Sequence, residues 1–273
     1  MEQHPAARVV PDARGGAVVV LDGHPQSHVD VEHPDDLVFE YVALLALALD
    51  VCAPEPAPAR LAVTHVGGGG LTLPRWVQHT RPGSPQVVLE PDAGLTAQVR
   101  RELPLPRGHR IRVRPVDGRT GVAALATGSA DAVVLDAYAG GRVPPELGTL
   151  EFLTDCARVL SPGGVLLANV ADEPGLRYAG RVAAGARAAL GHTAYLAPHE
   201  VLKGRRFGNG VLVARRGPVD VAELRRRLPR LPFPAGLLAD ADLRRRVPGA
   251  RPFLDAAAER SPEPPEPGRW RLR

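Results

Sequence analysis

The sequence predicts an α/β fold with a seven-stranded, mostly parallel sheet, and three observations lead to that fold class. From Leu61 onward, short apolar runs alternate with helix-compatible segments, the order that builds right-handed crossovers between parallel strands. A glycine turn, Gly67–Gly70, follows the first of these runs. The last two runs are joined by a loop, residues 198–208, which predicts a hairpin and one antiparallel strand. With 273 residues, 44% of them hydrophobic, the chain can bury such a core.

Residues 1–58 are predicted to form a small N-terminal β-hairpin followed by a helix. The apolar run 17–21 favours a strand, Asp22-Gly23 is a strong turn signal, and residues 27–31 can return as a second strand. This hairpin is the expected small N-terminal β element.

The helix of this N-terminal part is expected to run from a cap at Asp35 or Asp36 to about Val51. Its apolar residues follow helical spacing, and aspartate is a favoured N-cap. Three prolines after it predict a stiff linker at Pro54, Pro56 and Pro58.

Residues 59–217 are predicted to be the nucleoside-binding core. Its strands are expected at 61–66, 86–90, 110–115, 131–136, 164–170, 193–197 and 209–215. Its helices are expected at 71–80, 92–102, 119–126, 146–160 and 175–190. The antiparallel hairpin at the end gives this Rossmann-like sheet the arrangement of the S-adenosylmethionine-dependent methyltransferase fold. Residues 218–273 are then expected to form two short helices and a tail rich in proline and arginine.

The charge is distributed unevenly along the chain. Residues 1–202 carry 17 Arg and 22 Asp and Glu, a net charge of −5, whereas residues 203–273 carry 17 Lys and Arg and 8 Asp and Glu, a net charge of +9. The basic part has arginine clusters in helix-like segments without interleaved aromatic residues, so solvated helix faces are favoured over a nucleic-acid surface. The acidic main part suits a cationic substrate better than a polyanion.

The cysteines bear on metal binding, and the apolar runs and first residues bear on the cellular location. The two cysteines have neither a disulfide framework nor metal-ligand spacing, so no metal is expected. The longest apolar run, residues 42–49, is too short to span a bilayer, and the first residues lack the pattern of a secretory signal. We therefore expect a cytoplasmic protein with no membrane partner.

The glycine turn and the next strand predict a nucleoside site. Gly67, Gly68 and Gly69 come directly after a buried strand, and glycine lets the backbone approach a ligand where a Cβ would collide. Glu90 ends the following strand, where a carboxylate can accept both ribose hydroxyls. The alternative for these residues is a tight strand-to-helix turn with a solvated glutamate.

The third and fourth predicted strands are expected to end at the same edge of the sheet, with Asp117 after the third and Asp136 at the end of the fourth. Asp117 follows the third strand and could accept from an adenine amino group, with the amide of Gly118 beside it. No Walker lysine follows the glycines, which argues against a nucleoside triphosphate.

Asp136 is the carboxylate best placed for catalysis. It closes an apolar strand, so it should be partly buried, where it could orient an amine and help remove its proton. The alternative is an acid that caps the next turn through backbone amides. Tyr138 could line the same pocket or be a packing ring. Gln26, near the expected hairpin turn, could reach over the crevice or lie on the surface.

From Val18 to Arg215 the chain resembles the spermidine synthase (polyamine aminopropyltransferase) family. Residues 21–26 resemble its N-terminal hairpin with a glutamine at Gln26, and Phe39-Glu40-Tyr41 resembles the family's tyrosine motif. The remaining matches follow in order and spacing, namely the glycine loop, Glu90-Pro91-Asp92, Asp117-Gly118-Arg119 and residues 131–136. The resemblance implies a site in which Tyr41 and Tyr138 face a polyamine substrate, decarboxylated S-adenosylmethionine as co-substrate, and a homodimer.

The chain departs from that family on the amine side of the site. Ala139 stands where active members carry a second aspartate, and Val42-Ala43 replaces a His-Glu pair. The expected function is therefore that of a spermidine-synthase-like transferase whose aminopropyl transfer to a polyamine or other amine is impaired or redirected. Two alternatives stay open: a methyltransferase that uses intact S-adenosylmethionine, with the glycine amides or Arg75 binding its carboxylate, and a non-catalytic thioadenosine-binding protein.

Overall fold

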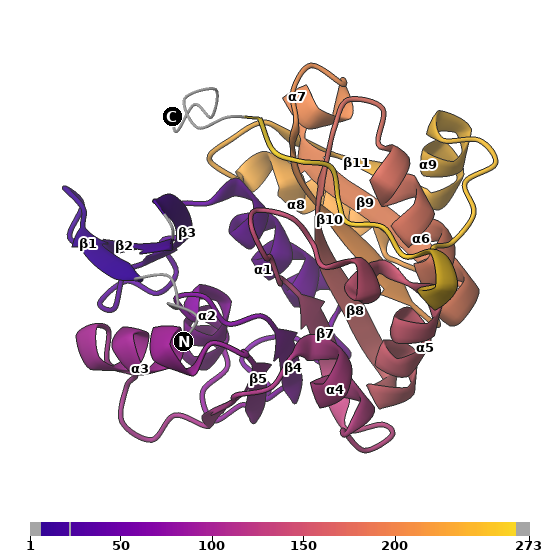
Figure 1. The fold of residues 1–273 in the computed structure, drawn as a ribbon. Helices are drawn as coiled ribbons and strands as arrows, with labels where there is room; N and C mark the ends of the chain where they lie inside the picture. The colour runs from indigo at the N-terminus through magenta and orange to yellow at the C-terminus, as the bar shows by residue number, and fades with distance from the viewer. Residues whose placement is uncertain (1–6, 22, 266–273) are drawn as a thin grey trace.

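The computed structural model describes residues 7–21 and 23–265, which form a mixed α/β fold around one large sheet (Figure 1). Within these residues the sheet has eight strands, in the spatial order β11 (Ala235–Ala239), β9 (His192–Pro198), β10 (Gly208–Arg215), β8 (Leu160–Asp172), β7 (Ala130–Leu135), β4 (Val63–Val66), β5 (Gln86–Leu89) and β6 (Ile111–Arg114). The run from β6 to β8 is parallel, whereas β10 lies antiparallel to both β8 and β9. The predicted mostly parallel sheet with a terminal hairpin is confirmed.

The predicted number of seven strands is wrong by one. The additional strand, β11, pairs antiparallel with β9 at the edge of the sheet. Its five residues, Ala-Gly-Leu-Leu-Ala, lack alternation and lie between the two short helices that the sequence predicts, so nothing local distinguishes them from a connecting loop. The pairing comes from the open edge of β9, which no sequence window contains.

Helices cover both faces of the sheet (Figure 1). One face packs against α1 (Glu40–Cys52), α2 (Thr72–Thr80) and α8 (Val221–Arg227). The other packs against α5 (Leu150–Val159), α6 (Arg177–Leu190) and α9 (Asp240–Arg246). Strand residues alternate between the two apolar cores, as the two-residue period of a strand requires. The shorter elements are α3 (Ala93–Glu102), α4 (Gly118–Ala123), α7 (His199–Leu202) and the 3-10 turns η1 (Pro145–Gly148), η2 (Leu228–Arg230) and η3 (Asp255–Ala257).

Helix α1 begins later than predicted. Its first residue is Glu40 and its N-cap is Phe39, so neither Asp35 nor Asp36 caps it. Asp30 makes the turn instead, because its carboxylate accepts from the amides of Glu32 (2.9 Å) and His33 (2.8 Å). The segment before α1 is therefore an irregular connection that leads into the helix at Tyr41.

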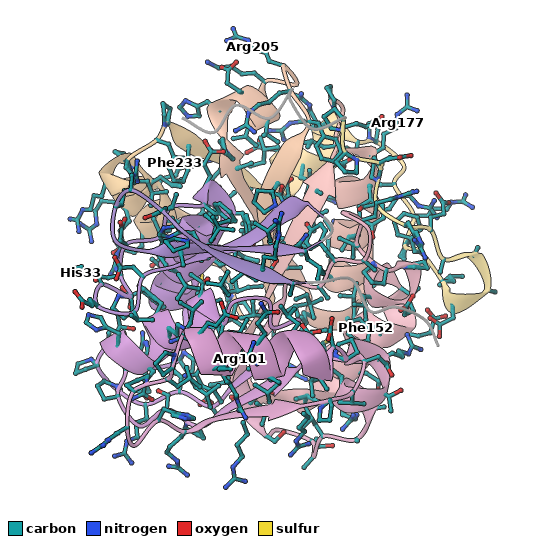
Figure 2. The ribbon with its side chains drawn as sticks, turned by 60° about the vertical axis from the view of Figure 1, so that its left-hand side comes forward. His33, Arg101, Phe152, Arg177, Arg205 and Phe233 are labelled. Atoms are coloured by element: carbon teal, nitrogen blue, oxygen red, sulfur yellow. The ribbon has the colours of Figure 1, made fainter. Side chains whose placement is uncertain are left out.

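The N-terminal β element is a three-stranded antiparallel sheet of β1 (Arg8–Pro11), β2 (Ala17–Leu21) and β3 (His24–Val29). The predicted hairpin corresponds to β2 and β3, although Asp22 of its turn lies outside the described residues. The return strand β3 begins at 24, not 27, and β1 adds the third strand. Figure 2 shows this sheet lying across the molecule beside α3, which carries Arg101.

Among the described residues, no helix has the length and apolar character needed to cross a membrane.

Candidate functional site

The glycine loop closes the tip of β4 against the tip of β7. Gly67 has φ +95°, and its amide donates to the carbonyl of Leu89 at 2.9 Å. A Cβ on Gly67 would come within 2.1 Å of the Asp136 carbonyl oxygen. Glycine is required here because any side chain would separate the loop from the strand that carries Asp136.

Glu90 lies directly beneath this loop. One carboxylate oxygen, Oε2, accepts from the amide of Gly68 at 2.8 Å, and the other, Oε1, accepts from the amide of Asp92 at 3.0 Å. Each oxygen of a carboxylate has a second acceptor position, so Glu90 can still accept from hydroxyl groups. The fold therefore brings together two of the residues that the sequence singles out, with Glu90 oriented by backbone amides.

The N-terminal sheet contacts the glycine loop through Ser27, a residue that the sequence reading missed. The Ser27 hydroxyl accepts from the amide of Gly70 at 2.9 Å, and both groups are buried. Next to it, the Thr72 hydroxyl donates to the carbonyl of His28 at 2.8 Å. Gln26 is partly buried on β3 at an irregularity in its pairing with β2, and its role toward a ligand stays a prediction.

Asp117 caps helix α4. Its side chain is exposed and accepts from the amide of Thr120 at 2.8 Å. Backbone hydrogen bonds of this kind hold the pKa of Asp117 below its usual value. Gly118 is buried, and a Cβ there would lie 2.3 Å from a methyl group of Val66, so α4 packs closely on the tip of β4. A contact of either residue with adenine stays a prediction.

Asp136 belongs to a polar network on the α1 face of the sheet. Its Oδ1 accepts from the side-chain amide of Asn169 at 2.8 Å, and the hydroxyl of Tyr41 is its second partner. Asn209 extends the network, because its amide nitrogen lies 2.9 Å from Asn169 Oδ1 and 3.1 Å from the Tyr138 hydroxyl. Tyr138 in turn donates to the carbonyl of Asn169 at 3.3 Å.

Burial raises the pKa of Asp136 to about 6, against the opposing effect of the hydrogen bonds from Asn169 and Tyr41. The same burial, together with the negative charge of Asp136, holds the pKa of the Tyr41 hydroxyl well above its ordinary value. Near neutral pH the network therefore contains a deprotonated carboxylate between two neutral phenols. Such a group can bind an ammonium ion and accept a proton from it.

Sequence reading found Tyr41, Asp136 and Tyr138 but missed the two asparagines that join them. Asn169 lies in the long buried strand β8, and Asn209 lies near the start of β10. A polar residue within a buried apolar run is the signal that marks Asn169. Asn209, flanked by two glycines, has no comparable local signal.

Arg75, which the methyltransferase alternative offers as a partner for a carboxylate, already has backbone partners. Its side chain is buried, and its guanidinium donates to three backbone carbonyls, those of Gly70 (3.4 Å), Pro104 (3.0 Å) and Leu103. Burial lowers its pKa to about 10. The guanidinium joins the glycine loop to the end of α3, and each of its three nitrogens donates to a backbone carbonyl.

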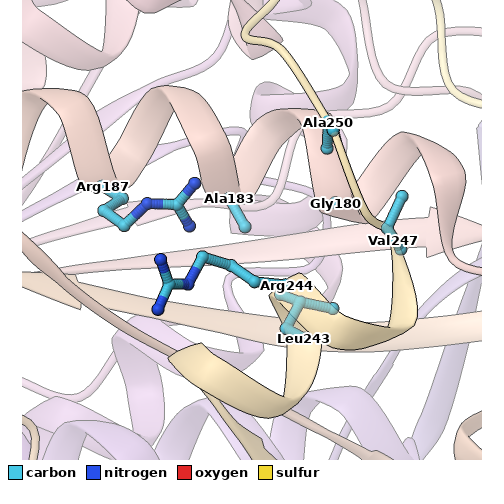
Figure 3. Close-up of a pocket in the computed structure, with 8 residues that line it drawn as sticks. Gly180, Ala183, Arg187, Leu243, Arg244, Val247 and Ala250 are labelled. Atoms are coloured by element: carbon cyan, nitrogen blue, oxygen red, sulfur yellow. The ribbon is translucent and has the colours of Figure 1, made fainter.

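A second hollow lies away from the strand tips, between α6 and α9 (Figure 3). It is lined by small and apolar residues and by Arg187 and Arg244. Both guanidiniums are already paired with Asp240, at 2.9 and 3.2 Å. The strand tips are therefore the stronger candidate site, because the carboxylates of Glu90 and Asp136 can still accept further hydrogen bonds there. No group of three or more metal-ligating side chains occurs within residues 7–21 and 23–265.

Comparison with known proteins finds similarity to polyamine aminopropyltransferases. No family model matches the chain. It is 30% identical over 146 residues to a polyamine aminopropyltransferase of Chromobacterium violaceum, and 30% identical over 144 residues to one of Vibrio vulnificus. These alignments cover 53% and 51% of this chain and 53% and 46% of the relatives, so the chain spans about half the length of the curated relatives it matches.

The similarity to solved structures extends over more of the chain. A probable spermidine synthase from Corynebacterium glutamicum superposes with a TM-score of 0.84, at 29% identity, over 93% of this chain and 94% of that one. Human methyltransferase-like protein 13 in complex with SAH superposes with a TM-score of 0.56 at 22% identity, covering 80% of this chain and 96% of that one, and shows the shared fold alone. The chain is a divergent spermidine-synthase-like protein with the methyltransferase fold.

Proposed function

We propose that this protein binds decarboxylated S-adenosylmethionine at the tips of β4, β5 and β6 and transfers its aminopropyl group to an amine held beside Asp136. The observation that carries the proposal is the position of Asp136. This partly buried carboxylate is bonded to Tyr41 and Asn169, and its backbone lies against Gly67 of the glycine loop. The nucleoside side and the amine side thus meet at one point.

In the proposed reaction Asp136 acts as the base. The lone pair of the acceptor nitrogen attacks the carbon next to the sulfonium sulfur, the bond from that carbon to sulfur breaks, and methylthioadenosine leaves with the bonding electrons. The nitrogen must lose a proton, which passes to Asp136 and then to solvent. With a pKa of about 6, Asp136 is deprotonated at neutral pH and can accept that proton.

The contacts of the glycine loop favour the decarboxylated co-substrate over the intact one. The amides of Gly67, Gly68 and Gly70 already donate to Leu89, Glu90 and Ser27. Arg75 is equally committed, to backbone carbonyls. A methionine carboxylate would lose its hydration without gaining these donors, which is costly for an anion.

Titration calorimetry with methylthioadenosine, decarboxylated S-adenosylmethionine and intact S-adenosylmethionine tests the proposal, followed by an assay of methylthioadenosine release with an added amine. We expect the first two nucleosides to bind at least about tenfold more tightly than the third, a difference of about 1.4 kcal/mol. Tighter binding of the intact form, with methyl transfer to an acceptor, would support the methyltransferase alternative instead. Binding without turnover of any amine would support the thioadenosine-binding alternative. The homodimer and the cytoplasmic location stay predictions.

The variant Glu90→Ala tests the ribose contact. A hydrogen bond to a charged group contributes about 1.5–3 kcal/mol, so loss of the carboxylate should weaken methylthioadenosine binding at least about tenfold. Glu90→Gln distinguishes loss of the negative charge from disruption of the glycine loop, since its amide oxygen can still accept from the Gly68 amide. Glu102→Ala, on the exposed end of α3, is the control and should bind as the wild type does. A loss below about threefold in Glu90→Ala would rule out the ribose assignment.

A further inference from the structure

We propose that the acceptor is a monoamine, a molecule with a single ammonium group, and that a diamine is a poor substrate. This inference rests on the proposed function and concerns the amine side of the same site. It follows from the charges in and around the network of Tyr41, Asp136, Tyr138, Asn169 and Asn209.

Asp136 is the single charged group in this network. Its side-chain partners are a phenol and a carboxamide, and no other charged residue contributes to the environment of its carboxylate among the residues described. Asn169 and Asn209 occupy the positions next to it, and both are neutral. One ammonium group can therefore be neutralised here, and a second would enter without a counter-charge, at a cost that a dry site makes large.

The two nearest acids along the chain are already occupied. Glu40, which precedes Tyr41, accepts from the Arg206 guanidinium at 2.6 Å. Asp172, at the end of β8, is fully buried and accepts from the amides of Glu173 (2.8 Å) and Ala179 (2.7 Å). Glu40 is thus already paired with a cation, and Asp172 has no exposed surface, so neither supplies an unpaired and accessible negative charge for a second ammonium group.

The rim beside Asn209 carries positive charge. Residues 203–206 read Lys-Gly-Arg-Arg, and the Arg206 guanidinium lies close to Gly208, since a Cβ built there would be 3.1 Å from its Nη1. Arg205 and Arg206 have acidic partners, Glu200 and Glu40, which leaves this short loop with the charge of Lys203 in excess. This rim therefore offers a distal ammonium group no unpaired negative charge, whereas an alkyl or neutral polar end needs none.

The test compares n-butylamine with putrescine, which share a four-carbon chain and differ by one amine. Methylthioadenosine binding is measured first by calorimetry, so that failure of the nucleoside site is recognised separately. We expect kcat/KM for methylthioadenosine release from decarboxylated S-adenosylmethionine to be at least about tenfold higher with n-butylamine, the size of one well-placed charge interaction. Equal or better use of putrescine, or nucleoside binding with no release from either amine, would overturn the inference.

Asn209→Asp sharpens the test because it adds a carboxylate without changing the shape of the side chain. We expect it to raise kcat/KM for putrescine relative to n-butylamine at least about tenfold, while the Kd of methylthioadenosine stays within about twofold. Asn209→Ala is the matched control, since it removes the amide without adding charge and should lower the rates of both amines to the same extent.

A second variant keeps the inference testable if Asn209→Asp does not fold. Arg206→Gln lies on the partly exposed rim and releases Glu40, so it should also shift preference toward putrescine. If folded Asn209→Asp and Arg206→Gln both bind methylthioadenosine and neither shifts the ratio of the two amines, the charge of the crevice does not select the acceptor.

Discussion

At the scale of single residues, Asp136 shows how burial changes the pKa of a common side chain. The chain has many carboxylates, and several are bonded in ways that keep their pKa low, as in Asp117 and Asp255. Asp136 differs because burial outweighs its two hydrogen bonds and raises its pKa. A raised carboxyl pKa near the working pH is what a general base requires.

The pKa of Asp136 predicts an acid limb in the pH profile of turnover. The carboxylate must be deprotonated to accept a proton, so turnover at saturating amine should fall as pH decreases through about 6. Asp136→Asn keeps the size of the side chain and removes the base. It should lower turnover at least about 100-fold and abolish the limb near pH 6, with little change in nucleoside affinity.

Rates of methylthioadenosine release between pH 5 and 8 measure this effect. Asp155→Asn makes the same chemical change on the surface of α5, where the carboxylate pairs with Arg158, and should leave the profile unchanged. Turnover of Asp136→Asn within about tenfold of the wild type would remove this residue from the mechanism.

Burial of Asp136 and Asp172 also predicts how stability depends on pH. Both carboxyls have a folded-state pKa of about 6, above the ordinary value of 3.8. Between these values the folded state binds more protons than the unfolded state, so the contribution of both groups to stability decreases as pH rises from about 4 to 6. Neither group therefore supports the fold at neutral pH, which agrees with a functional reason for Asp136.

At the scale of elements, the sequence predicts the parallel core well because short apolar runs alternate regularly with helix-compatible segments. It fails where long-range contacts select the structure. β11 forms on the open edge of β9, and α1 begins at Glu40 with no side-chain cap, although Asp35 or Asp36 was expected to cap it. For the same reason sequence alone finds Asp136 and Tyr41 but not Asn169 and Asn209, whose strands pair across 40 residues.

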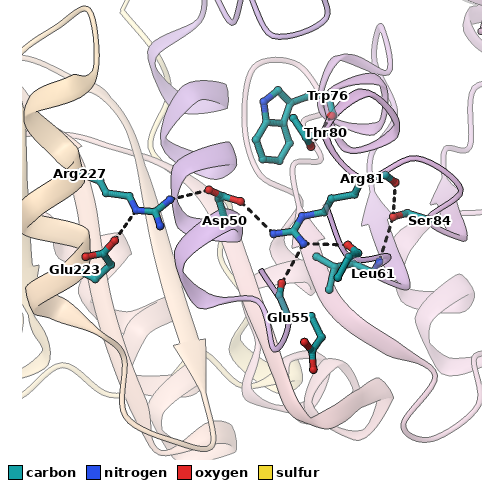
Figure 4. Close-up of polar contacts among 10 residues, drawn as sticks. Asp50, Glu55, Leu61, Trp76, Thr80, Arg81, Ser84, Glu223 and Arg227 are labelled. Atoms are coloured by element: carbon teal, nitrogen blue, oxygen red, sulfur yellow. Dashed lines mark hydrogen bonds and ion pairs between the residues drawn. The ribbon is translucent and has the colours of Figure 1, made fainter. Parts of the chain in front are cut away.

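A chain of ion pairs holds α1 between α2 and α8 (Figure 4). Asp50 on α1 accepts from Arg81 at 3.1 Å and from Arg227 at 2.7 Å, and Arg227 also bonds Glu223 at 2.6 Å. The Arg81 side chain is 0% exposed and further donates to the carbonyls of Glu55 and Ala59, both at 3.0 Å. Asp50 is thus the counter-charge of a buried cation.

We predict that Asp50→Ala lowers the free energy of unfolding by about 1–3 kcal/mol, because it leaves the buried Arg81 guanidinium with carbonyl partners alone. Glu200→Ala removes an exposed pair with Arg205 and is the control, with an expected loss of about 0–1 kcal/mol. Chemical denaturation of the three proteins measures the difference. Equal losses in the two variants would show that the network around α1 adds no more than a surface pair.

At the scale of the whole molecule, a C-terminal strap, residues 252–264, joins parts of the fold that are distant in sequence. Phe253 is buried, stacks on Tyr178 with ring centroids 5.1 Å apart, and lies 3.8 Å beneath the Arg181 guanidinium. Farther along, the Ser261 hydroxyl accepts from the amide of Val143 at 2.9 Å, in the loop that follows Asp136. The strap therefore anchors the loop that follows Asp136.

Phe253→Ala should release the strap, because truncation of a buried phenylalanine costs about 3–5 kcal/mol. Trypsin should then cut after Arg260 at least about tenfold faster than in the wild type, since a tenfold rise in the open population needs only about 1.4 kcal/mol. Leu254→Ala is the matched control, since that side chain is 46% exposed, and its cleavage rate should stay within about twofold. Similar cleavage rates in both variants would mean that Phe253 does not anchor the strap.

The strap also affects the order in which parts of the chain can fold during synthesis. Ser261 is made 118 residues after Val143, the residue that it holds. At a synthesis rate of about 5–20 residues per second, roughly 6–24 s pass before the loop after Asp136 can meet its anchor. The glycine loop and Glu90 are made earlier still, so on the ribosome they can take up their contacts well before the loop after Asp136 is anchored.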